Sequence, residues 1–173
     1  EDILVTVYTN CDELELYLNG ESYGRNKIEK YGHGEWNVPY EAGELKVFGY
    51  RNGKIAAEDK RTTTGNAVSL RLIPCNEFEA NGSDLALFTC ECLDENGNVV
   101  PDASEYVKFS VNAPAKIIGT GSDNCDHNNV ANNERQMFMG KILVAVKPAK
   151  DQKIIKLTAM SDKCSVTSVK ITL

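Results

Sequence analysis

The chain has 173 residues, of which 42% are hydrophobic and 25% charged, and its formal net charge is -6. The composition is ordinary for a globular protein with a buried core. The acidic balance, without a cluster of Lys or Arg, argues against a nucleic-acid partner, because phosphates need a basic surface. No apolar run approaches the roughly 20 residues of a membrane-spanning helix, so no membrane span is predicted.

The first predicted element is a β-hairpin unit near the start of the chain. Apolar residues alternate with polar ones over residues 3–7 and again over residues 14–18. Asn19-Gly20 follows, a pair that tolerates the positive φ angles of a tight turn. Because Glu1-Asp2 stands directly before a strand, where a signal peptide would otherwise be, we expect the chain to be part of a longer polypeptide.

The same period-2 pattern continues and predicts a first sandwich that ends at Pro74. Asn52-Gly53 marks a second hairpin corner. The remaining alternating segments are residues 36–40, 45–50, 55–60 and 68–72. About seven short β-segments without a helical stripe are typical of a small immunoglobulin-like sandwich.

A second set of strands follows a polar stretch at residues 76–83, where alternation breaks between Pro74 and Gly82. Its strands are predicted at residues 84–94, 106–111, 116–119, 141–147, 153–160 and 165–173. The predicted fold class is therefore all-β, with two tandem immunoglobulin-like β-sandwiches at residues 1–74 and 75–173.

The six cysteines do not suggest a disulfide-stapled miniprotein. Cys90 and Cys92 share one strand face, and such thiols usually act as small buried hydrophobes. A disulfide involving Cys75, Cys125 or Cys164 is an alternative, and a metal site is another, although no spacing matches a zinc pattern. The redox compartment stays open.

Residues 121–140 form a loop that is too long for a simple hairpin turn and rich in Asn and Asp. Asp123, Asn124, Asp126 and Asn128 place four oxygen donors within six residues, which is compatible with calcium. The glycine and distal glutamate of an EF-hand are missing. The alternative is that these side chains cap turns.

Exposed aromatic rings would indicate carbohydrate binding. The candidates are Tyr23, Tyr31, Trp36, Tyr40 and Tyr50. Trp36 is in phase with its strand's apolar face and is assigned to the core. Tyr31 lies in a predicted loop at residues 24–34, and we assign it, with His33 beside it, as the candidate contact for a sugar or a partner.

No catalytic residue is predicted. A retaining glycosidase needs two carboxyl groups about 5 Å apart, and the acidic residues here fall on outward strand positions or at turns. The two histidines, His33 and His127, lie in different predicted domains and near no nucleophile motif. The chain is also too short for a (β/α)₈ barrel, which needs about 250 residues. No cofactor is expected.

Several segments resemble landmarks of the C-terminal region of bacterial family 2 glycoside hydrolases, the group with β-galactosidases, β-glucuronidases and β-mannosidases. In the first half these are Tyr8-Thr9-Asn10-Cys11-Asp12-Glu13, Leu18-Asn19-Gly20, Trp36-Asn37-Val38-Pro39-Tyr40, Gly43-Glu44-Leu45, Gly49-Tyr50 and Asn52-Gly53-Lys54. In the second half they are residues 84–86, 93–103 and 117–121. The chain departs from the family pattern at residues 121–127, where relatives show a Gly-Asn-Gly-Asp-Pro-like run.

The resemblance implies a bacterial enzyme whose jelly-roll, immunoglobulin-like and catalytic barrel domains lie outside this chain. The leading hypothesis is a non-catalytic accessory fragment that packs on the barrel, or shapes its active-site rim, in a β-galactosidase-like parent. A carbohydrate-binding module and a spacer of a surface protein are the alternatives. Export of the parent to the periplasm or the cell surface is compatible with the resemblance, and the localisation stays open.

Overall fold

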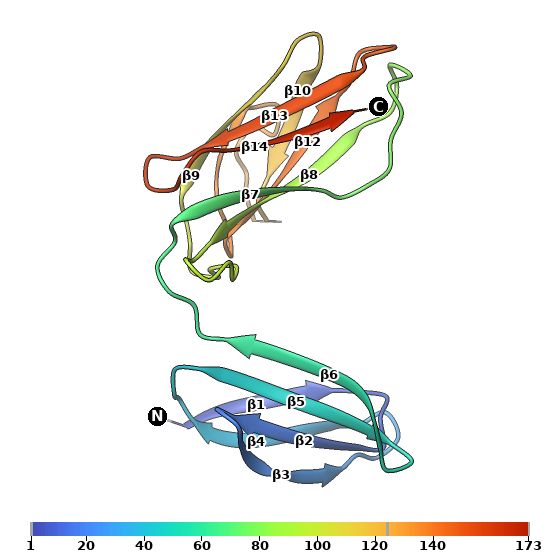
Figure 1. Cartoon of the computed structure of the whole chain (residues 1–173), viewed down its shortest axis with the longest axis vertical. Coiled ribbons are helices and arrows are strands. Elements are labelled where there is room, and N and C mark those ends of the chain that lie inside the picture. The colour runs from blue at the N-terminus through green and yellow to red at the C-terminus, as the bar shows by residue number, and fades with distance from the viewer. Residues whose placement is uncertain (1, 124, 173) are drawn as a thin grey trace. The chain divides into compact units, whose positions relative to one another are not determined.

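The computed structural model describes residues 2–123 and 125–172, and its regular structure within them is entirely β (Figure 1). The chain divides into two compact units, residues 1–63 and 64–173. The all-β sandwich prediction is thereby confirmed. Over the described residues, no helix is long and apolar enough to cross a membrane.

The first unit contains a two-stranded sheet and a four-stranded sheet. Its strands are β1 (Asp2–Tyr8), β2 (Glu13–Leu18), β3 (Glu21–Lys27), β4 (His33–Pro39), β5 (Glu44–Arg51) and β6 (Lys54–Thr62). The sheet orders are β1-β4 and β3-β2-β5-β6, with antiparallel neighbours throughout. Asn19-Gly20 and Asn52-Gly53 have positive φ angles and make the β2–β3 and β5–β6 turns, as predicted.

The core of the first unit is small. Its buried cluster consists of Leu14, Leu16, Trp36, Val38 and Val47. The alternation at residues 14–18 and the assignment of Trp36 to the core are confirmed, since Leu16 is 1% exposed and Trp36 7%. The indole lies across Gly34, where a Cβ would come within 2.6 Å of the ring, so this position requires glycine.

The second unit is an eight-stranded sandwich. Its strands are β7 (Ser69–Pro74), β8 (Ala86–Leu93), β9 (Tyr106–Val111), β10 (Lys116–Gly121), β11 (Glu134–Gln136), β12 (Lys141–Lys147), β13 (Ile154–Met160) and β14 (Thr167–Thr172). The sheet orders are β10-β12-β8-β7 and β11-β9-β13-β14. This is the immunoglobulin constant-type arrangement, extended by the short β11. In immunoglobulin lettering, the first sheet contains strands D (β10), E (β12), B (β8) and A (β7). The second sheet contains strands C (β9), F (β13) and G (β14).

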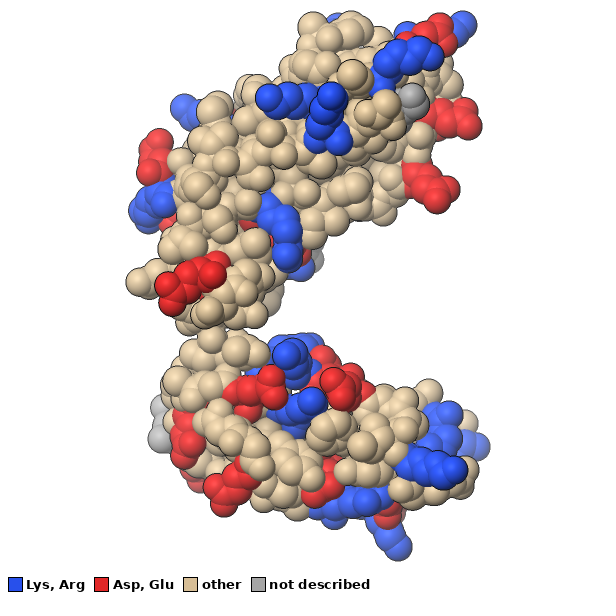
Figure 2. Space-filling model, viewed as in Figure 1, with Lys and Arg blue, Asp and Glu red and all other residues tan. Residues whose placement is uncertain are grey.

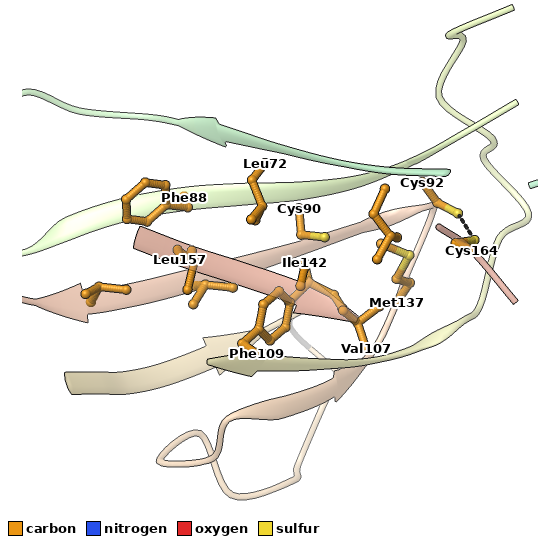
Figure 3. Packing of buried hydrophobic residues seen from close by; sticks show 14 of the residues in the cluster. Leu72, Phe88, Cys90, Cys92, Val107, Phe109, Met137, Ile142, Leu157 and Cys164 are labelled. Atoms are coloured by element: carbon orange, nitrogen blue, oxygen red, sulfur yellow. Dashed lines mark hydrogen bonds between the residues drawn. The ribbon is translucent and has the colours of Figure 1, made fainter. Parts of the chain in front are cut away.

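The second core lies between these two sheets and is larger than the first. Phe88, Cys90 and Cys92 point inward from β8, and Phe109 and Leu157 point toward them from the facing sheet (Figure 3). Cys90 and Cys92 are fully buried thiols, which confirms their assignment as core residues. No disulfide is present among Cys11, Cys75, Cys90, Cys92 and Cys164.

The boundary between the units differs from the predicted division at residues 74 and 75. The structure divides the chain after Thr63. The reason is that β7 pairs with β8 along its full length, from Ser69 opposite Leu93 to Pro74 opposite Phe88. Residues 64–74 therefore belong to the second unit, and the first sandwich has six strands where about seven were predicted.

One buried carboxylate connects three strands on the face of β8 opposite Phe88 and Cys90. Glu91 lies between Arg71 on β7 and Lys141 on β12, both of which are its register partners. Arg71 Nη2 is 2.6 Å and Lys141 Nζ 3.1 Å from its carboxylate oxygens. Burial opposes ionisation, but the hydrogen bonds and charges of Arg71 and Lys141 outweigh it and lower the pKa of Glu91.

We expect the Glu91→Gln substitution to reduce the free energy of unfolding at pH 7 by about 1.5–3 kcal/mol, the range for hydrogen bonds to charged groups. Because the pKa of Glu91 is lowered by folding, its contribution is present above the unfolded-state pKa and is lost as the pH falls through the folded-state pKa. Urea titrations at pH 7 and pH 3 should therefore show a smaller difference between variant and wild type at pH 3. Glu95→Gln, at an exposed turn position, is the control. An equal loss at both pH values would contradict the prediction.

Candidate functional site

The first unit has an apolar groove because its two sheets differ in width. The β1-β4 sheet has two strands and the sheet that it covers has four. Every residue of β6 is exposed, and β1 pairs with β4 alone among the described strands. The groove thus runs between the free edge of β1 and the uncovered side of β5 and β6.

This docking groove has a volume of about 330 Å³. Its lining residues are Val5, Thr6, Val7, Tyr8, Leu16, Leu45, Lys46, Val47, Asp59, Lys60 and Arg61. The basic side chains of the rim already have partners: Arg61 contacts Asp59 at 2.7 Å and Lys60 contacts Glu44 at 3.3 Å. Charges of both signs are mixed over the visible face of this unit (Figure 2). The groove therefore presents an apolar floor within an electrically balanced rim.

The predicted contact residues Tyr31 and His33 lie near each other in the chain but in different surroundings. Residues 21–27 are strand β3, so the loop predicted at residues 24–34 is shorter than expected, and His33 is the first residue of β4. Tyr31 is 92% exposed and has a φ of 68°, which is unfavourable for a residue with a Cβ. The His33 ring lies 5.4 Å from the ring of Tyr8, and its Nε2 is 3.0 Å from Glu35.

The long loop predicted at residues 121–140 is shorter in the structure, because it lies between β10 and β11 at residues 122–133, and one buried arginine organises it. Arg135, on β11, is 3% exposed. Its guanidinium donates to Asp126 Oδ2 at 2.7 Å and to the backbone oxygens of Thr120 and Asn129, each at 2.8 Å. It also donates to Thr120 Oγ1 at 3.2 Å. These bonds connect Arg135 to Thr120, which precedes the loop, and to Asp126 and Asn129 within it.

Three of the four predicted cation ligands face one polar hollow of about 390 Å³. Asp123, Asp126 and Asn128 line it together with Arg135 and Phe138. Asn124, the fourth, lies outside the described residues. The backbone N–H of Asn128, followed by the Asn128 side chain and the Arg135 charge, lowers the pKa of Asp126 against the effect of burial. Arg135 thus supplies the positive charge that a cation would bring.

Within the described part of the chain, no three His, Cys, Asp or Glu side chains converge so as to hold a metal ion. Cation binding by Asp123, Asn124, Asp126 and Asn128 stays a prediction. The capping alternative is compatible with the contacts observed, because the Asp126 side chain accepts the backbone N–H of Asn128 at 3.0 Å and the Asn129 side chain that of Ala131 at 3.0 Å.

All the carboxyl groups whose pKa values are altered have lowered pKa values. Hydrogen bonds from Tyr50 to Glu15, from Arg61 to Asp59 and from the backbone of Gly65 to Asp94 lower the pKa of each of these carboxyl groups. The pKa values of Glu91 and Asp126 are lowered as well. A glycosidase acid needs the opposite, a carboxyl whose pKa is raised so that it holds a proton at neutral pH.

Sequence reasoning missed the docking groove and the role of Arg135. The groove depends on how many strands each sheet receives, which no local pattern gives. For Arg135 the available signal was a single arginine at the end of a long Asn- and Asp-rich segment, just before an apolar run.

These features define a pair of all-β sandwich domains, the first of which has an apolar groove on its surface. Residues 73–170 match the family described as Glycoside hydrolase family 2 C-terminal domain 5, and residues 1–57 match a domain of unknown function, DUF4982. The chain therefore belongs to glycoside hydrolase family 2, as a part of its C-terminal region. The resemblance stated from the sequence is confirmed.

Individual relatives agree with this assignment. Beta-galactosidase BoGH2A of Bacteroides ovatus is 36% identical over 95% of this chain and 20% of its own length. A putative beta-glucuronidase of Formosa agariphila is 32% identical over 99% of this chain and 17% of its own length. A solved family 2 structure from Bacteroides cellulosilyticus superimposes with a TM-score of 0.91 at 33% identity, covering 99% of this chain and 24% of that one. The chain thus spans about a fifth of the length of the curated relatives it matches.

Proposed function

We propose that the chain is a non-catalytic accessory region of a larger β-glycosidase, and that the docking groove of its first unit packs on the catalytic barrel or another domain of the same polypeptide. The observation that carries the proposal is the family match, in which this chain corresponds to only 17–20% of the curated relatives. Most of each relative is therefore polypeptide that can cover the groove. The parent is expected to hydrolyse β-glycosides, with a β-galactoside as the first substrate class to test.

Two further observations support this function. The altered carboxyl pKa values are all lowered, which suits ion pairs and turns and does not suit a glycosidase acid. The groove floor of Val5, Val7 and Leu45 is only partly buried, although these side chains pack against the core. Covering such apolar surface is favourable by about 25 cal/mol for each Å² removed from water.

Hydrogen exchange of the full-length parent and of the isolated chain tests the docking. We expect the amides of residues 5–8 and 59–61 to exchange at least tenfold more slowly in the parent, because they line a groove that another domain covers. The β5–β6 turn at residues 51–54 lies outside the lining and is the internal control. Equal exchange rates at the groove in both proteins would exclude docking there.

Activity assays test the non-catalytic role separately. The isolated chain should show no turnover of nitrophenyl β-galactoside or β-glucuronide, whereas the parent should hydrolyse one of them. Turnover by the isolated chain that survives stringent purification would overturn the proposal.

Carbohydrate contact at Tyr31 is the second candidate function. It is favoured by the exposed Tyr31 ring and by the unfavourable backbone conformation of this residue. Because no packing of the ring offsets that conformation, the conformation points to a functional role. Lys30 Nζ lies 5.0 Å from the ring centre and Tyr8 and His33 add two further rings on this unit. Calorimetry with oligosaccharides of plant and host glycans should show at least tenfold weaker binding for Tyr31→Ala. Tyr40→Ala, 62% exposed, is the control, and absence of binding by the wild type would remove this candidate.

A further inference from the structure

Two buried thiols meet at one end of the second sandwich. Cys92 points inward from β8, and Cys164 lies in the segment that connects β13 to β14 (Figure 3). Their sulfur atoms are 3.4 Å apart although the residues are 72 positions apart in the sequence. Cys92 is fully buried and Cys164 is 5% exposed.

The backbone holds this approach in place independently of the thiols. Val68 donates its N–H to the carbonyl of Leu93 at 2.9 Å, and its own carbonyl accepts the N–H of Ser165 at 3.1 Å. Leu93 and Ser165 are the residues that follow the two cysteines. A single residue therefore bridges the chain segments that carry Cys92 and Cys164, and the thiol contact is a consequence of the fold.

We propose that Cys92 and Cys164 are a cross-linking site at which a low-molecular-weight disulfide, such as oxidised glutathione, converts the two thiols into a protein disulfide while the chain folds. A disulfide has a sulfur–sulfur distance of about 2.05 Å, so the two sulfurs have to approach each other by little more than an ångström. This inference does not depend on the proposed function of the chain.

The reaction is two successive thiol–disulfide exchanges. One cysteine thiolate attacks the small disulfide, which releases one small thiol and leaves a mixed disulfide on the protein. The second cysteine thiolate then attacks the protein sulfur of that mixed disulfide and releases the second small thiol. The two protein thiols together lose two electrons and two protons. The small disulfide takes up these electrons and protons and becomes two small thiols.

The timing follows from burial. In the folded chain, burial and the contact with Cys164 raise the pKa of Cys92 to about 12, and the thiolate is the attacking species. Neither small disulfide nor solvent reaches a fully buried sulfur. The cross-link therefore forms before the sandwich closes, and a chain that has folded in the reduced state is oxidised much more slowly.

Refolding the whole chain from urea tests this cross-link. In a buffer of reduced and oxidised glutathione, we expect the refolded chain to lose two titratable thiols and peptide mapping by mass spectrometry to find Cys92 joined to Cys164. Native reduced chain in the same buffer should oxidise at least a hundredfold more slowly. For a closed loop of 72 residues, the disulfide should raise the folding equilibrium constant on the order of a thousandfold.

Cys90→Ala is the matched control, because Cys90 is equally buried two residues away on the same face and its loss should leave the cross-link intact. Cys92→Ala and Cys164→Ala should each retain all their thiols after oxidative refolding. Wild-type chain that keeps every thiol, or that joins a different pair, would overturn the proposal without reliance on any variant. Native chain that oxidises as fast as refolding chain would overturn the timing.

Discussion

Replacing Arg135 by methionine is expected to lower the free energy of unfolding of the second unit by about 3–5 kcal/mol, the usual cost of removing one partner from a buried ion pair. The substitution keeps an unbranched side chain of similar length but removes four hydrogen bonds to Thr120, Asp126 and Asn129. The carbonyl groups of Thr120 and Asn129 lose this donor at the same time, which adds to the loss. Urea denaturation followed by far-ultraviolet circular dichroism measures the change.

Lys163→Met is the control for this experiment. Lys163 pairs with Glu105 at 3.0 Å in the same unit, but its side chain is 75% exposed. Exposed ion pairs contribute about 0–1 kcal/mol, so the control should unfold close to the wild type. Arg135→Lys separates charge from geometry, because one ammonium group cannot reproduce the planar fork of donors. If Arg135→Met and Lys163→Met gave equal losses, the organising role of Arg135 would be wrong.

Local patterns predicted the parts of this fold that local physics determines. Alternation of apolar residues at 14–18 gave a strand with the correct inward face, and Asn19-Gly20 gave its turn, because both depend on neighbours in the sequence. The assignment of residues 68–74 to one of the two sandwiches depends instead on residues far away in the sequence. Their alternation was recognised, but their partner β8 begins twelve residues after Pro74, and pairing across that distance has no signature in the strand itself.

The candidate site shows the same division. The sequence identified the long polar loop as unusual, yet the group that organises it, Arg135, acts through atoms of Thr120 and Asn129, which the fold brings to it. The docking groove is even less predictable from local sequence patterns, because it arises from a two-stranded sheet that faces a four-stranded one. Tyr31 was recognised as exposed because turn residues and glycines flank it, but its positive φ required the structure.

Leu16→Ala is expected to destabilise the first unit by about 2–5 kcal/mol and to leave the second unit unchanged. Leu16 is 1% exposed in a core with few buried residues, and a domain of this size has little stability to lose. The chain provides a probe for this unit alone, because Trp36 is its one tryptophan and lies in the same core as Leu16. Tryptophan fluorescence should therefore report unfolding at a lower urea concentration, while the circular dichroism signal of the second unit persists.

Leu157→Ala is the matched experiment in the other core, where Leu157 is fully buried. It removes the same side-chain atoms, so it should lower the second transition by a similar amount and leave the Trp36 transition in place. Leu16→Ala should thus shift only the unfolding transition of the first unit, and Leu157→Ala only that of the second. This is the result expected of two sandwiches with separate cores. Coincident transitions that both variants shift together would instead mean that the two units unfold as one cooperative body. In the full-length parent, the first unit should unfold at a higher urea concentration than in the isolated chain, because the proposed docking in the groove adds binding free energy that only the folded first unit receives.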